Sequence, residues 1–291
     1  MAVVGGILAA FYLVAAAAAM TVFGTGVLPI VLVGSVLLIG VQYKIGKWAA
    51  LRSVGAEDLP EDEYPQLHRT VESMSRDMGI EKPTLKIASM GVPNAFAVGR
   101  KGAGTVVVSR ELLSTLDQNE VEGVLAHELA HIRNRDVVLM VLGQGIASIV
   151  AIVAQYAVLF TGDNDIADFF LAIVVGNVVQ FIVMLFVMAI SRYREYVADS
   201  DAKDVIGSGE PLASALEKIQ RAAQGGGAGA GSSASGIGGG RTRGRRGRRG
   251  RSDDGLDKQV SALCIFGGDA GIEKILSTHP PVEKRIERLR S

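Results

Sequence analysis

The sequence has a single cysteine in 291 residues and three long stretches without any charged side chain. The lone cysteine, Cys264, cannot form an internal disulfide, and this suits a reducing compartment. Charged residues are missing from Met1 to Tyr43, from Val137 to Phe160 and from Phe169 to Ile190. The formal net charge of zero therefore hides a strong segregation of charge along the chain. Together with a positive mean hydropathy, these runs indicate an integral membrane protein.

The uncharged runs are long enough for four membrane-spanning helices. The first run would be roughly 65 Å long as a helix, about twice the thickness of a hydrocarbon core, so it must fold back. The simplest turn lies at 24–26, with spans near Val3 to Phe23 and Leu28 to Tyr43. The second and third runs each fit one crossing. A cleaved signal peptide is the alternative for the first run, but a basic leader is missing and a second span follows at once.

The orientation of the spans is predicted from the charges of the short flanking segments. The connections "GTG" and "TGDNDIAD" contain no basic residue. The positive-inside rule therefore places both termini and the long polar segments, with any active site that they contain, in the cytoplasm. The basic residues that flank the spans on this same side are Lys44, Lys47, Arg52, Arg133, Arg135, Arg192 and Arg194.

The polar segments predict helices and a small β-sheet, hence an α+β fold. "QLHRTVESMSRDMGI" has helical spacing, whereas "PTLKIASM", "NAFAVG" and "GTVVVS" are typical of strands, the last two joined as a hairpin. A short helix capped by Ser109 and a longer one after a break near Asp117 follow, and two more helices come after the fourth span. The predicted segments are two transmembrane helices in 1–43, the first part of a cytoplasmic domain in 44–136, a transmembrane hairpin in 137–190, the second part of the domain in 191–223, a disordered Gly/Arg-rich insertion in 224–255 and a C-terminal helical part in 256–291.

The segment "VEGVLAHELAHIRNRD" carries the clearest chemical signal, because His127 and His131 are four positions apart on a predicted helix. Residues at this spacing share a face, so both imidazoles can reach one point about 2 Å from each. Glu128 is rotated by about 100° and cannot share that point, but it can reach a water held there. This H-E-x-x-H arrangement is typical of zinc hydrolases with a glutamate as general base. The alternative is a chance pattern on a surface helix.

A third ligand can be sought by height above the membrane. If the His131 helix continues into the third span, His131 lies roughly 9 Å before Val137. If the fourth span continues outward as a helix, Glu195 lies roughly 7.5 Å beyond Ile190. The hairpin makes these helices antiparallel neighbours, so Glu195 is predicted to lie beside His131. Asp199, one turn further, could accept a hydrogen bond from a ligand histidine. The alternative is a basic membrane border in which both carboxylates pair with nearby arginines.

Four motifs, "PNAFAVG", "GVLAHELAHIRNRD", "SRYREYVADSDA" and "STHPPVEKRIERL", resemble those of the membrane-embedded zinc metalloproteases of the HtpX type. The resemblance runs in order from about Glu61 to the C-terminus. It implies a mainly helical α+β gluzincin protease with four transmembrane helices and a cytoplasmic zincin-like domain. It further implies one Zn²⁺ per chain, with His127, His131 and Glu195 as ligands, Glu128 as the base and Asp199 behind a ligand.

The resemblance also implies a cellular role and a mode of substrate binding. The implied role is ATP-independent cleavage of misfolded or damaged membrane proteins in the cytoplasmic membrane, as quality control under stress. Asn94 and Ala95 would lie on an edge strand that pairs with an extended substrate. His279 would help to stabilise the oxyanion, and Arg285 is a further candidate for substrate binding. Without the resemblance, the strand is an ordinary hairpin and His279 a lone loop histidine; His68 is assigned no function.

The sequence leaves alternatives open for the role of the insertion and for the function of the whole chain. The insertion 224–255 departs from the family pattern, and its arginines in 241–251 would be attracted to anionic headgroups at ~1 kcal/mol each. It could equally be a solvated linker, with RNA as a less favoured ligand.

The whole chain could also form a non-catalytic membrane scaffold that binds anionic partners through the arginines in 241–251. Alternatively, the enzyme could process one substrate as the CaaX prenyl endopeptidases do, although those have more membrane helices.

Overall fold

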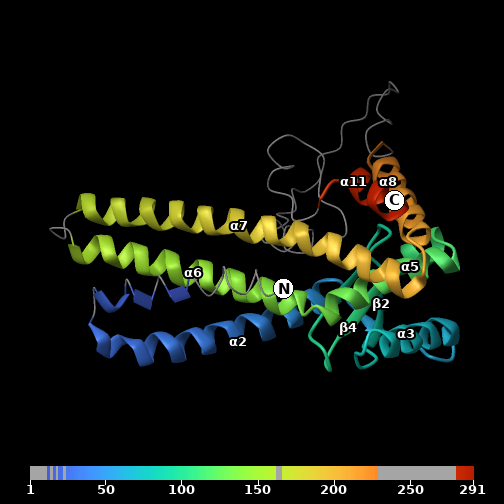
Figure 1. The fold of residues 1–291 in the computed structure, drawn as a ribbon, viewed down its shortest axis with the longest axis horizontal. Helices are drawn as coiled ribbons and strands as arrows, with labels where there is room; N and C mark the ends of the chain where they lie inside the picture. The colour runs from blue at the N-terminus through green and yellow to red at the C-terminus, as the bar shows by residue number, and fades with distance from the viewer. Residues whose placement is uncertain (1–11, 14–15, 18, 22–23, 162–165, 229–279) are drawn as a thin grey trace, which may run out of the picture.

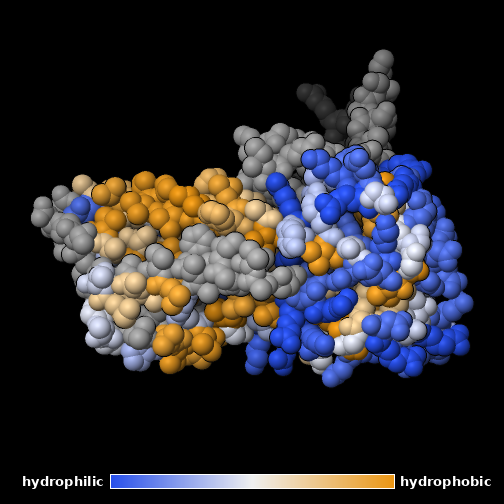
Figure 2. Space-filling model, in the orientation of Figure 1, coloured by the Kyte–Doolittle hydropathy of each residue, from blue (hydrophilic) through white to orange (hydrophobic). Residues whose placement is uncertain are grey.

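The chain forms an elongated molecule with long helices at one end and a small α+β domain at the other (Figure 1). The computed structural model describes residues 12–13, 16–17, 19–21, 24–161, 166–228 and 280–291. Hydrophobic residues cover the end made of long helices, and hydrophilic residues cover much of the other end (Figure 2). The elements at the apolar end are the short 3₁₀ helix η1 (Thr25–Val27), α2 (Leu28–Ser53), α6 (Asp136–Thr161) and α7 (Ile166–Ile206).

Two of the described helices, α6 over Asp136–Leu159 and α7, are long and apolar enough to cross a membrane. Only a minority of their most apolar stretches is buried inside the protein, 33% in α6 and 22% in α7. Large apolar side chains such as Phe170 and Val174 are instead exposed. A water-exposed surface of this kind would be unfavourable, whereas lipid tails are a suitable surrounding for it.

The prediction of four spans extends beyond these two helices. Most of the first predicted span, Val3 to Phe23, lies outside the described residues. The second, Leu28 to Tyr43, coincides with the start of α2, which continues to Ser53 and packs against α6. Exposed apolar side chains, including Ile30 and Val36, follow α2 along its length. The four-span arrangement therefore stays a prediction.

The predicted sheet is present and has four strands in the order β1-β2-β4-β3. The hairpin between β3 and β4 is antiparallel, as expected, and β2 pairs with β4 in parallel, so the sheet is mixed. The sequence did not predict β1, because it is two acidic residues that pair antiparallel with β2. The strands are β1 (Glu57–Asp58), β2 (Thr84–Ala88), β3 (Ala95–Val98) and β4 (Thr105–Ser109).

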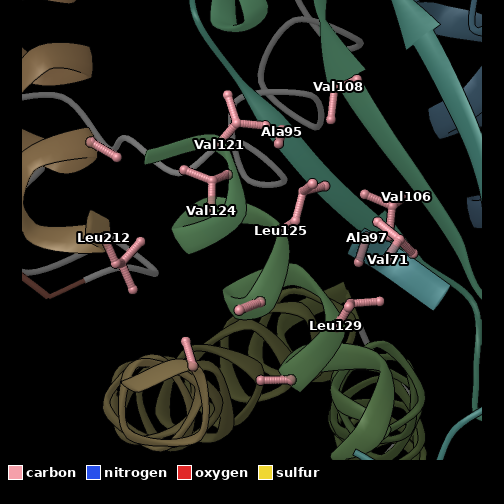
Figure 3. Packing of buried hydrophobic residues seen from close by; sticks show 14 of the residues in the cluster. Val71, Ala95, Ala97, Val106, Val108, Val121, Val124, Leu125, Leu129 and Leu212 are labelled. Carbon is pink, nitrogen blue, oxygen red and sulfur yellow. The ribbon is translucent and has the colours of Figure 1, made fainter. Parts of the chain in front are cut away.

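The inner strand β4 is buried throughout, with three consecutive valines at its centre, because both faces of the sheet are covered. Side chains alternate between faces, so Val106 and Val108 join the main core, whereas Val107 packs in a smaller cluster with Phe96 and, from α2, Ala50. Helix α5 (Gln118–Arg133) covers the main-core face, with Leu125 and Leu129 fully buried (Figure 3). The histidine-bearing helix is thus held between the sheet and the remaining helices.

The predicted helix starts in this region are confirmed. Ser109 caps the short helix α4 (Arg110–Thr115) by accepting a hydrogen bond from the amide of Leu112 at 3.0 Å. Asp117 begins α5 with a capping box, in which Asp117 and Glu120 each accept the backbone N–H of the other. Helix α3 (Pro65–Asp77) is also present where helical spacing predicted it.

The expected continuity between the histidine helix and the following apolar helix is wrong. Helix α5 ends at Arg133 and α6 starts at Asp136, with Arg135 between them at φ 57°. This left-handed conformation costs a residue other than glycine about 1–2 kcal/mol. The sequence gives no signal of this break. A residue with a β-carbon, such as Arg135, normally disfavours the left-handed conformation that ends α5 here.

By contrast, α7 continues beyond its apolar part without a break, as predicted, from Ile166 to Ile206. It ends before Gly207, and α8 (Glu210–Ala228) and the C-terminal α11 (Val282–Arg290) complete the domain. Helix α8 extends through 224–228, the first residues of the predicted insertion, and the predicted disorder of 224–255 stays a prediction. The rest of the insertion lies outside the described residues.

Candidate metal centre

Two histidines and one carboxylate converge between α5 and α7. One potential ligand atom from each of His127, His131 and Glu195 lies within 4.8 Å of the other two. The two histidine Nε2 atoms are 3.1 Å apart. The Glu195 Oε2 atom lies 3.5 Å from His127 Nε2, and Oε1 lies 3.5 Å from His131 Nε2. The predicted i, i+4 pair and the distant glutamate therefore face one common point.

Glu195 lies beside the two histidines, as the height argument predicts, although the histidine helix does not continue into the apolar helix α6. Helix α7 packs along both α6 and α5, so Glu195 reaches the histidines even though α5 and α6 are separate helices. His127 and Glu195 are nearly inaccessible, at 1% and 3% exposure. His131 is the more open of the two histidines, with 12% of its side chain exposed.

Each histidine uses its other ring nitrogen on a second carboxylate. His127 Nδ1 lies 3.0 Å from Asp199 Oδ1, and His131 Nδ1 lies 2.6 Å from Asp136 Oδ2. An ionised carboxylate only accepts hydrogen bonds, so each Nδ1 carries a proton, and each Nε2, once deprotonated, offers its lone pair to a metal. Two imidazole lone pairs and a carboxylate oxygen are a donor set that zinc binds in hydrolases. The residues therefore fit a zinc ion.

Arg285 approaches the same group from α11 and is fully buried, at 0% exposure. Its Nε and Nη2 donate to the two carboxylate oxygens of Asp199 at 2.9 and 2.7 Å. Its Nη1 lies 3.4 Å from Glu195 Oε2. The guanidinium is predicted as a substrate-binding group, and in the structure it contacts these carboxylates, with Nη2 3.4 and 3.3 Å from Nδ1 and Nε2 of His127.

The buried charges shift one another's protonation. Burial and the Arg285 cation disfavour a protonated His127, but hydrogen bonds to Asp199 and Glu195 outweigh them and raise the pKa of His127 to about 9. Burial by itself would raise the pKa of Asp199, but Arg285 and His127 hold it at about 2. The position between the carboxylates therefore favours positive charge, which is also what a bound cation requires.

Glu128 is 3% exposed and lies one residue beyond His127 on α5. Burial opposes the ionised form of Arg285, but the charges of Asp199, Glu195 and Glu128 raise the pKa of this guanidinium above its ordinary value. The Glu128 carboxylate thus lies within the electrostatic reach of the same cluster. This location is the one that the sequence predicts for a general base.

Asn94 and Ala95 lie at the start of β3, the outer strand of the sheet on the side away from β1. Helix α5 contacts β3 directly. The Asn94 backbone is fixed by Ser109, whose Oγ accepts the Asn94 amide at 2.9 Å and whose amide donates to the Asn94 carbonyl at 2.8 Å. An edge strand therefore lies beside the histidine helix, but its residues Ala95–Val98 are buried, and the predicted pairing with a substrate stays a prediction.

His279 lies outside the described residues, so its predicted contact with an oxyanion stays a prediction. His68 is buried on α3, and its Nε2 lies 3.0 Å from the Leu59 carbonyl oxygen. It lies outside the histidine and carboxylate group, in keeping with the absence of any assigned function.

Sequence reasoning missed Asp136 as a partner of the site. It also missed Arg194, whose Nε lies 2.9 Å from Asp136 Oδ1. The available signal was the short segment "RNRD", in which an acidic residue directly precedes an uncharged run and is well placed as the first residue of a helix. From the sequence alone, Arg194 is indicated as a membrane-flanking charge or as a partner of Glu195 and Asp199.

Comparisons with known proteins identify relatives of this chain. The model of peptidase family M48 matches residues 61–291. A Protease HtpX homolog of Halobacterium salinarum is 68% identical over 100% of both chains. Homologs with the same name from Salinibacter ruber and Aquifex aeolicus are 32% and 36% identical over 91% and 82% of this chain and 88% and 75% of theirs.

A solved structure, that of S. mikatae Ste24p, shares the fold with a TM-score of 0.57 at 18% sequence identity. The match covers 99% of this chain but only 62% of that protein, which is therefore considerably longer. The mainly helical architecture with a small mixed sheet is thus similar to that of Ste24p.

Proposed function

Because the chain belongs to peptidase family M48 and is a membrane metalloprotease, we propose that it is a zinc-dependent endopeptidase that cleaves misfolded membrane proteins at the cytoplasmic face. The observation that carries the proposal is the convergence of His127, His131 and Glu195 within 4.8 Å. Zinc bound there would supply Lewis acidity, which polarises a carbonyl and makes water more acidic. The proposed ligands are these three residues.

In the proposed mechanism, the chain's own groups orient the reactants and move the proton. The Glu128 carboxylate accepts a proton as water attacks the carbonyl carbon, and it returns that proton to the nitrogen that leaves when the C–N bond breaks. Asp199 keeps the Nδ1 proton on His127, and Arg285 holds Asp199 in place through two hydrogen bonds. The buried surroundings exclude bulk water and strengthen each of these interactions.

The proposed substrate contact is backbone pairing along the edge of β3 that faces away from β4. Beginning at Ala95, this strand has β4 on one side only. An extended chain added there would be held through main-chain hydrogen bonds, largely independently of its side-chain sequence. Such broad recognition suits an enzyme that acts on many unfolded or misfolded proteins.

Purified protein in detergent is expected to cleave casein, to lose about 100-fold or more of that activity after treatment with a zinc chelator, and to regain it on adding Zn²⁺. Cleavage that persists once zinc is no longer detectable in the protein would contradict a metal-dependent mechanism.

The same cleavage assay on peptides tests the proposed pairing with β3. Backbone N-methylation at alternate residues removes main-chain donors and should reduce kcat/KM by about 10-fold, since a lost hydrogen bond is worth about 0.5–1.5 kcal/mol.

A prenylated peptide serves as the comparison substrate for CaaX-type processing. Under the proposed function, it should be cleaved no better than its unmodified counterpart. Selective cleavage of the prenylated form would instead favour processing of one modified substrate. Equal cleavage of N-methylated and unmethylated peptides would contradict pairing along β3.

The proposed cytoplasmic orientation can be tested through Cys264, the natural single thiol. A membrane-impermeant thiol reagent is expected to leave Cys264 unlabelled in intact cells and to label it in inside-out vesicles. Detergent-permeabilised cells provide the control for reactivity of the thiol. Labelling in intact cells would place the C-terminal part on the outer side and contradict the proposed orientation.

A further inference from the structure

Asp136 connects one histidine of the metal centre to a buried arginine. It is the first residue of α6 and is 0% exposed. Its Oδ2 lies 2.6 Å from His131 Nδ1, and its Oδ1 lies 2.9 Å from Arg194 Nε. Arg194 is itself only 6% exposed. One carboxylate therefore spans from a proposed ligand to a cation buried on a different helix.

The arrangement repeats around the other histidine with different residues. His127 contacts Asp199, which accepts two hydrogen bonds from Arg285. Each proposed ligand histidine is thus followed by an aspartate and then by a buried arginine. The two histidine–aspartate–arginine series use residues from different parts of the sequence, so a short local motif does not account for the repetition.

The backbone is shaped to bring Asp136 into this position. A continuous helix from α5 into α6 would carry residue 136 past the face that holds His131, whereas the break at Arg135, with φ 57°, turns the chain at this point. A non-glycine residue in this conformation costs about 1–2 kcal/mol, so surrounding contacts must hold it. The Asp136 contacts to His131 and Arg194 are contacts of this kind.

We propose that Asp136 and Arg194 are positioning residues of the metal centre. Asp136 accepts a hydrogen bond from the Nδ1–H of His131, which leaves Nε2 to face the metal position, and Arg194 fixes the Asp136 carboxylate. Arg194 directly precedes Glu195 on α7, so this helix supplies one ligand and also braces another. The inference rests on the proposed metal centre.

The test compares zinc affinity, measured by competition with a chromophoric chelator in detergent, with the unfolding temperature of the metal-free protein. Asp136→Ala is expected to weaken zinc binding by about 10- to 100-fold, as for other carboxylates behind a ligand histidine. Asp201→Ala is the matched control. Asp201 also ties the end of α5 to α7, through Arg133 at 3.3 Å and Asn134 at 2.7 Å, but it contacts no proposed ligand. It should leave zinc affinity unchanged.

A double variant separates positioning from a merely structural ion pair. Asp136→Ala leaves Arg194 buried without its partner, which lowers stability for reasons unrelated to zinc. Asp136→Ala combined with Arg194→Met removes both charges and should recover most of the lost unfolding temperature, while zinc affinity stays as weak as in Asp136→Ala. Recovery of zinc affinity together with stability would overturn the proposal.

Arg194→Met alone should weaken zinc binding by about 10-fold, and it should have no further effect when Asp136 is already alanine, because it acts through that residue. Glu195→Gln distinguishes failure of this inference from failure of the metal centre. If the natural protein and Glu195→Gln bind zinc equally weakly, the metal centre is wrong and the inference falls with it. If Glu195→Gln loses zinc while Asp136→Ala keeps natural affinity, only the inference is overturned.

Discussion

Replacing Glu128 with glutamine is expected to reduce casein cleavage by about 10²- to 10⁴-fold while one zinc per chain is retained. Glutamine has nearly the same shape, so the buried position on α5 and the two neighbouring histidines should be undisturbed. What it lacks is a basic carboxylate to take the proton from water. Cleavage assays and metal analysis of the same preparation measure the two effects separately.

Glu122→Gln is the matched control for this experiment. Glu122 lies on the same helix, but its contacts are with Gln118 at 3.2 Å and Thr70 at 3.5 Å, away from the proposed ligands. It should keep full activity. Undiminished cleavage by Glu128→Gln would exclude the assigned base, and a role independent of catalysis, such as a membrane scaffold, would then become the better account.

Replacing Glu195 with alanine is expected to remove both bound zinc and activity. Structural zinc sites with four ligands bind with about 10–16 kcal/mol, so one ligand accounts for about 3 kcal/mol, or roughly a 100-fold loss of affinity. The two histidines would remain, with Nε2 atoms 3.1 Å apart, but without a carboxylate to complete the set. Metal analysis after extensive dialysis measures the loss directly.

The comparison variant for Glu195 is Asp204→Ala, which removes an exposed carboxylate from the same helix. It should retain zinc and activity. Full zinc content in Glu195→Ala would mean that a different residue is the third ligand. Since Glu195 is the only ligand that α7 is proposed to supply, the proposed metal centre would then be wrong.

Much of this grouping could be predicted because helical geometry carries over long distances. The spacing of His127 and His131 fixes a shared face, and two apolar segments of similar length place Glu195 near the same height. The strands were predictable for a similar reason: "GTVVVS" has three consecutive valines at its centre, and β4 is covered on both faces. These features depend on periodicity, which a sequence displays directly.

The features that were not predictable depend on single residues in unusual surroundings. Arg135 adopts a left-handed conformation without being glycine, so the break after α5 has no ordinary sequence signal. Arg285 and Arg194 belong to the residue types usually found on surfaces, yet both are buried against carboxylates. Only the assembled structure shows which opposite charges are available to compensate them.

The uninterrupted course of α7 has a mechanical consequence. One hydrogen-bonded rod carries apolar side chains suited to lipid near its beginning and both Glu195 and Asp199 near its end. A shift of α7 along its axis therefore moves these two carboxylates together. A change in bilayer thickness that shifts α7 relative to α5 would alter the proposed metal centre, which couples that centre to the lipid surroundings.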